Sequence, residues 1–255
     1  MVSGVTLPFE PTALALVLAV FAAFVIGVSK TSVGGVAALA VGIFGGLMPA
    51  KESTAAVLLL LIIGDVVGVW AYHKHADWGL LKKLLPAVLP GIALGALFVH
   101  FVPDVGLKKF IGVILVVMLG LQLWTRRKPA QVSDEAKQMH PAATISTGVA
   151  AGFTTMTANA AGPVMSLYLL AARVDKTRFL GTGAWYFLII NLTKVPFSAA
   201  LGLFHMSTLW LTLMLLPAVL LGTWLGRVLI KKVSQLWFER LTLAATAVAA
   251  VAMLL

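Results

Sequence analysis

The sequence predicts an all-α, polytopic helical membrane protein with about eight to ten transmembrane or re-entrant segments in two inverted repeats. Of its 255 residues, 60% are hydrophobic and only 11% are charged, and the mean hydropathy is +1.02. Such a chain has too few polar groups to cover the surface of a soluble protein. Its apolar runs are continuous rather than alternating, which favours helices over a membrane barrel. Finally, similar stretches recur in the two halves of the chain.

Ten apolar segments follow one another, each bounded by polar residues, glycine or proline. In the first half we expect them at 13–28, 33–48, 54–72, 80–101 and 107–124. In the second half we expect them at 142–158, 162–173, 179–202, 208–230 and 236–254. The leading two segments of each half are short, so they either cross the membrane or form re-entrant hairpins. This division gives a first repeat (1–125), a polar linker (126–140) and a second repeat (141–255).

The evidence for duplication is an ordered string that occurs twice. "LPAVLPGIALG" (85–95) and "LPAVLLGTWLG" (216–226) are identical at eight of eleven positions, with an offset of 131 residues. Further upstream, Gly27 matches Gly152 and Lys51 matches Lys176, with an offset of 125. Glycine-rich helices can look alike by composition alone, but a shared ordered string favours a repeat.

The distribution of positive charge predicts the orientation. Fifteen of the nineteen Lys and Arg residues fall in the odd-numbered connections and three in the even-numbered ones. The positive-inside rule then predicts a protein of the bacterial inner (plasma) membrane with a cytoplasmic linker and both termini periplasmic. Five segments per half make the repeats inverted. The net charge of +10 is explained by this pattern, so we expect no nucleic-acid partner.

Two polar, glycine-containing stretches occupy corresponding places in the halves: "GVSKTSVGG" (27–35) and "GFTTMTANAAGP" (152–163). Paired interruptions of this kind are typical of transporter binding sites, since interrupted helices offer N–H groups and a positive dipole end to an anion. The alternative is that they are tight turns whose glycines serve helix packing. The predicted substrate-binding residues here are Lys30, Thr31, Ser32, Gly34, Gly35, Thr155, Thr157, Asn159 and Gly162.

Lys30 itself has two interpretations. If segments 13–28 and 33–48 both cross, it lies in a cytoplasmic turn and only marks orientation. If they form a re-entrant hairpin, its ammonium lies near the midplane and can balance an anion.

Two charged residues lie deep in apolar segments. Lys194 follows Asn191 by three residues, so both face one side of a helix, and we predict both as substrate-binding. The alternative is a lysine that reaches the interface from a tilted helix. Asp65 is predicted to act in coupling or charge balance, either as a proton carrier or as the structural partner of Lys194.

The motif "HKHADWG" contains His73, His75 and Asp77, but its place at a segment end beside tryptophan is typical of an interfacial belt. We therefore expect no metal site and no cofactor. The sequence contains no cysteine, which excludes thiolate catalysis and Cys-ligated metal.

Several motifs in fixed order resemble the sulfite exporter TauE/SafE family, also called toluene sulfonate uptake permeases. They are the polar break with "LMPAKES" (47–53), "GTGAWYFLIINLTKVPFSAALG" (181–202) and "LPAVLLGTWLGRVLIKKVSQLWFERL" (216–241). The resemblance implies a bacterial transporter of sulfite, organosulfonates or related sulfur-containing or carboxylate anions. This chain departs from the usual glycine-dense first break by carrying Lys30 and hydroxyl side chains, so the resemblance does not fix the anion.

Transport by alternating access at a midplane site is therefore the predicted function, and we expect no enzymatic activity. An intramembrane enzyme would need a nucleophile–base pair, a carboxylate pair or metal ligands at depth. An anion channel would need a continuous polar pore. The expected partners are a small anion and the lipid bilayer, with a proton or sodium ion as candidate coupling ion. The oligomeric state is left open.

Overall fold

The computed structural model describes residues 7–31, 37–126, 140–229 and 235–254. In this part of the chain all of the regular secondary structure is helical. Besides the short 3₁₀ helix η1 (His73–His75), it contains ten α-helices: α1 (Ala13–Thr31), α2 (Ala37–Leu47), α3 (Ala50–Tyr72), α4 (Trp78–Phe101), α5 (Asp104–Arg126), α6 (Pro141–Ala158), α7 (Gly162–Ala171), α8 (Lys176–Ala200), α9 (Met206–Leu229) and α10 (Gln235–Leu254). Each predicted segment corresponds to one helix, so the predicted all-α fold class is confirmed. The predicted linker falls almost wholly outside the described residues.

The first polar stretch interrupts its helix later than predicted, and the second interrupts its helix at the predicted residue. α1 continues through Lys30 to Thr31, past the expected end at residue 28. The reason is that the Ser29 hydroxyl donates to the Ile26 carbonyl at 2.6 Å, a bond that a helix accommodates. In the second half α6 continues to Ala158 and ends at Asn159, whose φ of 50° is the left-handed conformation of a helix cap.

The second helix of each half is too short to cross a bilayer. α2 has 11 residues and α7 has 10, or about 16 and 15 Å of helix, against a hydrocarbon core of about 30 Å. This favours the re-entrant alternative for both leading pairs. By contrast, four described helical stretches are long and apolar enough to cross: Ala13–Thr31, Ala50–His75, Trp78–Phe101 and Met206–Val228.

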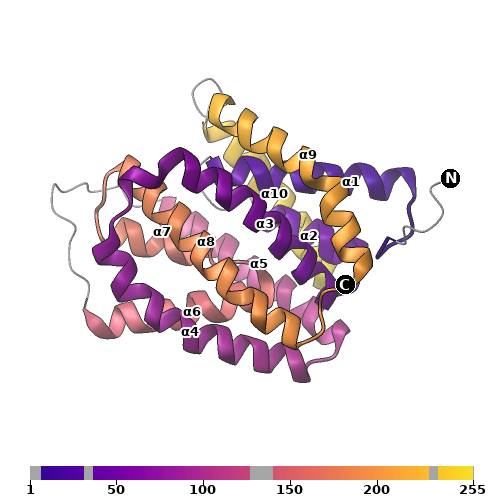
Figure 1. The fold of residues 1–255 in the computed structure, drawn as a ribbon, viewed down its shortest axis with the longest axis horizontal. Helices are drawn as coiled ribbons and strands as arrows, with labels where there is room; N and C mark the ends of the chain where they lie inside the picture. Colours follow the sequence, from indigo (N-terminus) through magenta and orange to yellow (C-terminus); the bar gives the residue numbers. More distant parts are fainter. Residues whose placement is uncertain (1–6, 32–36, 127–139, 230–234, 255) are drawn as a thin grey trace.

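Helices α3 and α8 lie side by side across the middle of the molecule, with α1 and α9 on one side and α4 and α6 on the other (Figure 1). α3 and α8 run antiparallel. At one end the Trp185 indole N–H donates to the His73 carbonyl at 3.4 Å, and at the other His205 Nε2 lies 4.0 Å from Glu52 Oε1. Helices α5 and α10 also pack together, with Gly112 of α5 against Ala250 and Leu254 near the end of α10.

Glycines bring the outer helices into backbone contact at two crossings. A Cβ on Gly27 of α1 would lie 2.1 Å from the Val219 carbonyl oxygen of α9, and one on Gly222 would lie 2.1 Å from the Phe24 oxygen. At the α4–α6 crossing a Cβ on Gly152 would lie 2.2 Å from the Val88 oxygen. The offsets that relate the two halves connect these contacts. Gly27 corresponds to Gly152 at the offset of 125, and Val219 corresponds to Val88 at the offset of 131, so the two crossings are equivalent. Small residues of this kind let membrane helices approach closely.

The outward faces of the helices carry large apolar side chains, among them Trp70, Phe101 and Val248, which are all well exposed. An apolar surface of this extent is suited to lipid rather than water. The fold and this surface together are those of a multi-pass membrane protein.

Candidate functional site

A cavity of about 80 Å³ lies where α1, α3, α6, α7 and α8 meet. A volume of this size holds several water molecules or one small anion. Its polar lining comes from both halves of the chain: Ser29, Lys30, Asp65, Thr155, Asn159, Ser166 and Asn191. The rest of the lining is apolar or glycine, so the polar groups are gathered in a mostly dry environment.

The first half of the chain contributes an ion pair. Lys30 Nζ, from the last turn of α1, lies 2.7 Å from Asp65 Oδ1 in α3, and the two side chains are 9% and 1% exposed. The stem of Lys30 crosses α3 at Gly64, where a Cβ would lie 2.8 Å from Lys30 Cγ. The ammonium also lies 4.8 Å from the centre of the Phe187 ring, a cation–π contact. These contacts hold the Lys30 ammonium at the cavity wall.

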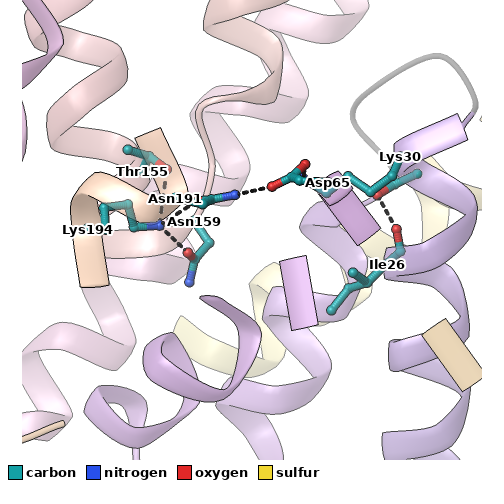
Figure 2. A network of polar contacts seen from close by, with 8 residues as sticks. Ile26, Lys30, Asp65, Thr155, Asn159, Asn191 and Lys194 are labelled. Carbon is teal, nitrogen blue, oxygen red and sulfur yellow. Dashed lines mark hydrogen bonds and ion pairs between the residues drawn. The ribbon is translucent and has the colours of Figure 1, made fainter. Parts of the chain in front are cut away.

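The second half contributes a lysine surrounded by neutral acceptors (Figure 2). Lys194 Nζ donates to Thr155 Oγ1 at 3.3 Å, to Asn191 Oδ1 at 3.3 Å and to Asn159 Oδ1. An ammonium has three N–H donors, and here all three are used within the protein. Lys194 is 2% exposed and lies behind the described lining rather than in it. Lys194 therefore contacts the cavity only indirectly, through the side chains of Thr155, Asn159 and Asn191 that lie between them.

Asn191 connects the two halves of the site. Its Nδ2 donates to Asp65 Oδ2 at 2.7 Å, while its Oδ1 accepts from Lys194. Asn159 is oriented in the same way, because its Nδ2 donates to the Thr54 carbonyl at 3.0 Å and leaves Oδ1 for Lys194. A continuous polar chain therefore runs from Lys30 through Asp65 and Asn191 to Lys194 (Figure 2).

Most of the predicted site residues lie together. The predicted residues that line the cavity are Lys30, Asp65, Thr155, Asn159, Gly162 and Asn191. Because Gly162 is also the first residue of α7, the positive end of that helix dipole lies at the cavity. Ser32, Gly34 and Gly35 lie outside the described residues.

Two predicted residues lie elsewhere. The Thr31 hydroxyl donates to the Thr223 carbonyl at 3.0 Å, at the contact between α1 and α9. The Thr157 hydroxyl donates to the Phe153 carbonyl of its own helix at 2.8 Å. Both residues are fully buried and absent from the described lining. The reason is helical phase: each lies on a helix that was expected to be interrupted, so its side chain faces a neighbouring helix.

Two expectations about charge need correction. One interpretation placed Lys30 in a cytoplasmic turn. Instead, Lys30 lies in the last turn of α1 and forms an ion pair with Asp65 of α3. For Asp65, one of the two interpretations made it the structural partner of Lys194. Instead its carboxylate contacts Lys30 and Asn191, and it reaches Lys194 only through the Asn191 amide.

Sequence reasoning missed Ser166 and Phe187, which both line the cavity. A signal for each was present. Ser166 follows Gly162 by four residues and Phe187 precedes Asn191 by four, so each lies on the same helix face as a predicted site residue. Gly64 was also missed, although it directly precedes the buried Asp65.

The arrangement suits the binding of an anion. It offers an ammonium, hydroxyl and amide groups and a helix N-terminus in an enclosed space. Among the described residues there is no group of three or more His, Cys, Asp or Glu side chains that could hold a metal.

In a comparison with known families, the family model described as sulfite exporter TauE/SafE aligns with residues 19–253. Comparison with curated proteins and with solved structures gives no match. The aligned range contains every described residue of the polar chain and both glycine crossings. The protein therefore belongs to the sulfite exporter TauE/SafE family of membrane transporters.

Proposed function

We propose that this protein carries a small anion across the bacterial inner membrane, by alternating access at the cavity around Lys30. The anions we favour are sulfite, organosulfonates and related sulfur-containing or carboxylate anions. The observation that carries the proposal is a largely enclosed ammonium at the wall of a cavity of suitable size. A charged group at depth in a membrane protein costs at least about 2.5–3.5 kcal/mol and is normally functional.

The chemistry of the lining supports an anionic substrate. Lys30 is the cation of the described lining, and Ser166, Asn159 and the start of α7 surround the same space. Oxygen atoms of a sulfonate or carboxylate accept hydrogen bonds from such donors. Nothing in this set requires a covalent step, so carriage of the anion explains it better than an intramembrane reaction does.

The packing supports an inverted repeat. Equivalent helices of the two halves pack together, α3 with α8 and α5 with α10, and the first of these pairs is antiparallel. If these helices cross the membrane, the axis relating the halves lies in the membrane plane, which is the architecture of alternating-access transporters. Together with the positive charge between repeats, this supports a cytoplasmic linker and two periplasmic termini.

Asp65 remains the candidate for coupling or charge balance. Its contact with Lys30 favours charge balance in the resting site, because the carboxylate takes the place that a substrate anion would occupy beside the ammonium. On binding, the anion shares Lys30 with Asp65.

Solute counterflow in proteoliposomes tests the proposal. Vesicles containing purified protein and preloaded with unlabelled sulfite should accumulate external radiolabelled sulfite transiently above equilibrium, which a carrier does and a channel does not. Methanesulfonate, thiosulfate and acetate should be tested as preloaded competitors, with protein-free vesicles as the control. Equal behaviour of protein-containing and protein-free vesicles for all four anions would refute the proposal.

A further inference from the structure

We propose that the site selects anions with a single negative charge, such as sulfite in its bisulfite form, sulfonates and monocarboxylates, over dianions such as thiosulfate. The inference rests on the proposed function and concerns the same cavity. Its basis is the net charge that the polar chain fixes around the cavity.

Three charged side chains make up this net charge: Lys30, Asp65 and Lys194. In the described part of the chain, the cavity lining and the residues hydrogen-bonded to Lys194 add no other acidic or basic side chain. The stretch 32–36 that follows Lys30 in sequence reads SVGGV and has no ionisable side chain. With both lysines and the aspartate ionised, the chain carries a net charge of about +1.

The three hydrogen bonds that Lys194 donates are those of an ammonium. Asn191 and Asn159 each use their amide nitrogen as a donor elsewhere, toward Asp65 and the Thr54 carbonyl, so each must present its oxygen to Lys194. Two fixed acceptors and the Thr155 hydroxyl surround one nitrogen. Three N–H donors satisfy this arrangement.

The hydrogen bonds likewise identify Asp65 as a carboxylate. Its Oδ1 faces the Lys30 ammonium at 2.7 Å, and its Oδ2 accepts from the Asn191 amide at 2.7 Å. Both oxygens thus face donors. A protonated carboxyl would need an acceptor on one side, and the Asn191 amide turns its nitrogen, not its oxygen, toward Asp65.

A net charge of about +1 in an enclosed, mostly apolar site is unfavourable until an anion neutralises it. A monoanion leaves the occupied site neutral, whereas a dianion leaves an excess negative charge beside Asp65. The repeat does not double the positive charge, because Thr155 occupies the position equivalent to Lys30 at the offset of 125. Specificity by charge is a form of discrimination against the wrong partner.

The test compares methanesulfonate with thiosulfate. The two anions are nearly the same shape but carry one and two negative charges. Isothermal titration of the purified protein in lipid nanodiscs, at matched ionic strength, should give an affinity for methanesulfonate about tenfold or more above that for thiosulfate. Equal or tighter binding of thiosulfate would overturn the charge inference while leaving anion transport intact. Absence of binding by either, together with absence of counterflow, would overturn the transport proposal as well.

Variants distinguish two explanations of a preference for methanesulfonate: the fixed charge of the site, and the stronger hydration of dianions in water. Asp65→Asn raises the net charge to about +2 and should move the affinity ratio toward thiosulfate by about tenfold. Adding Lys194→Met returns the net charge to about +1 and should restore the preference for methanesulfonate. If Asp65→Asn alone does not fold, the double variant can be compared with Lys194→Met alone. The Lys194→Met protein has a net charge of about zero, so it should bind methanesulfonate at least tenfold more weakly than the double variant does. A ratio that stays constant across these proteins would overturn the inference.

Discussion

The two glycine crossings are copies of one another, and the polar centre between them is not. At the α1–α9 and α4–α6 crossings, a Cβ added to the corresponding glycines would lie 2.1 and 2.2 Å from corresponding carbonyl oxygens. At the centre, Lys30 and Asp65 form an ion pair in the first half. The second half presents Thr155 at the place that matches Lys30, has Asn191 within one residue of the place that matches Asp65, and draws its ammonium from Lys194.

The difference shows which part of the molecule duplication explains. The crossings depend on backbone approach, which needs only glycine at the same place in each repeat. At the centre, two identical ion pairs facing one cavity would leave no net charge to attract the anion that we propose as substrate. A symmetric scaffold with an asymmetric centre therefore accounts for both observations, and it predicts that substitutions act equally at the crossings and unequally at the centre.

The largest effect is expected from Lys30→Met. The change removes the cavity cation and leaves Asp65 as an uncompensated buried charge, a loss of about 3–5 kcal/mol. Counterflow should fall by at least about a hundredfold. Lys30→Arg keeps the charge and is the matched control; it should retain measurable transport. Normal counterflow in folded Lys30→Met protein would remove Lys30 from the site.

The next effect concerns the crossings. Gly27→Ala and Gly152→Ala each place a methyl group against a backbone carbonyl, which should destabilise the protein by about 1–3 kcal/mol. The two variants should lose similar amounts, measured as the melting temperature in detergent. Gly46→Ala, where an added Cβ meets nothing within 4 Å, is the control and should melt like the parent. A large loss in one crossing variant and none in the other would break the equivalence of the halves.

The smallest effect is expected at the two threonines that lie away from the cavity. Thr31→Val and Thr157→Val each remove a hydrogen bond to a backbone carbonyl, worth about 0.5–1.5 kcal/mol of stability. The concentration of anion giving half-maximal counterflow should change by less than about twofold. A much larger change in that concentration, without loss of stability, would return these residues to the binding site.

The sequence allowed the fold to be predicted because each helix is a long apolar run with polar or glycine ends. It allowed much of the site to be predicted because a charged residue deep in an apolar segment, such as Asp65 or Lys194, is energetically costly and is therefore normally functional. It did not reveal which lysine faces the cavity. Both Lys30 and Lys194 were predicted to bind the substrate, and only the orientations of Asn159 and Asn191 distinguish a lysine with its three donors used from one at the cavity wall.

Helical phase caused the other misplacements. Treating 27–35 as an interruption made neighbours such as Lys30 and Thr31 equivalent, as if all faced one space. In a continuous helix they are 100° apart, so one reaches α3 and the other reaches α9. Periodicity alone cannot say where a helix ends when serine and threonine side chains bond its own or a neighbouring backbone.

The most direct measurement uses the absence of native cysteine. Lys30→Cys and Lys194→Cys proteins should each be treated with aminoethyl methanethiosulfonate, which attaches an ammonium close to the length of a lysine side chain. The account predicts that transport returns in the Lys30→Cys protein, and that methanesulfonate slows its labelling, while the Lys194→Cys protein shows no such protection. Protection at position 194 but not at position 30 would contradict the assignment of Lys30 as the cation that meets the anion.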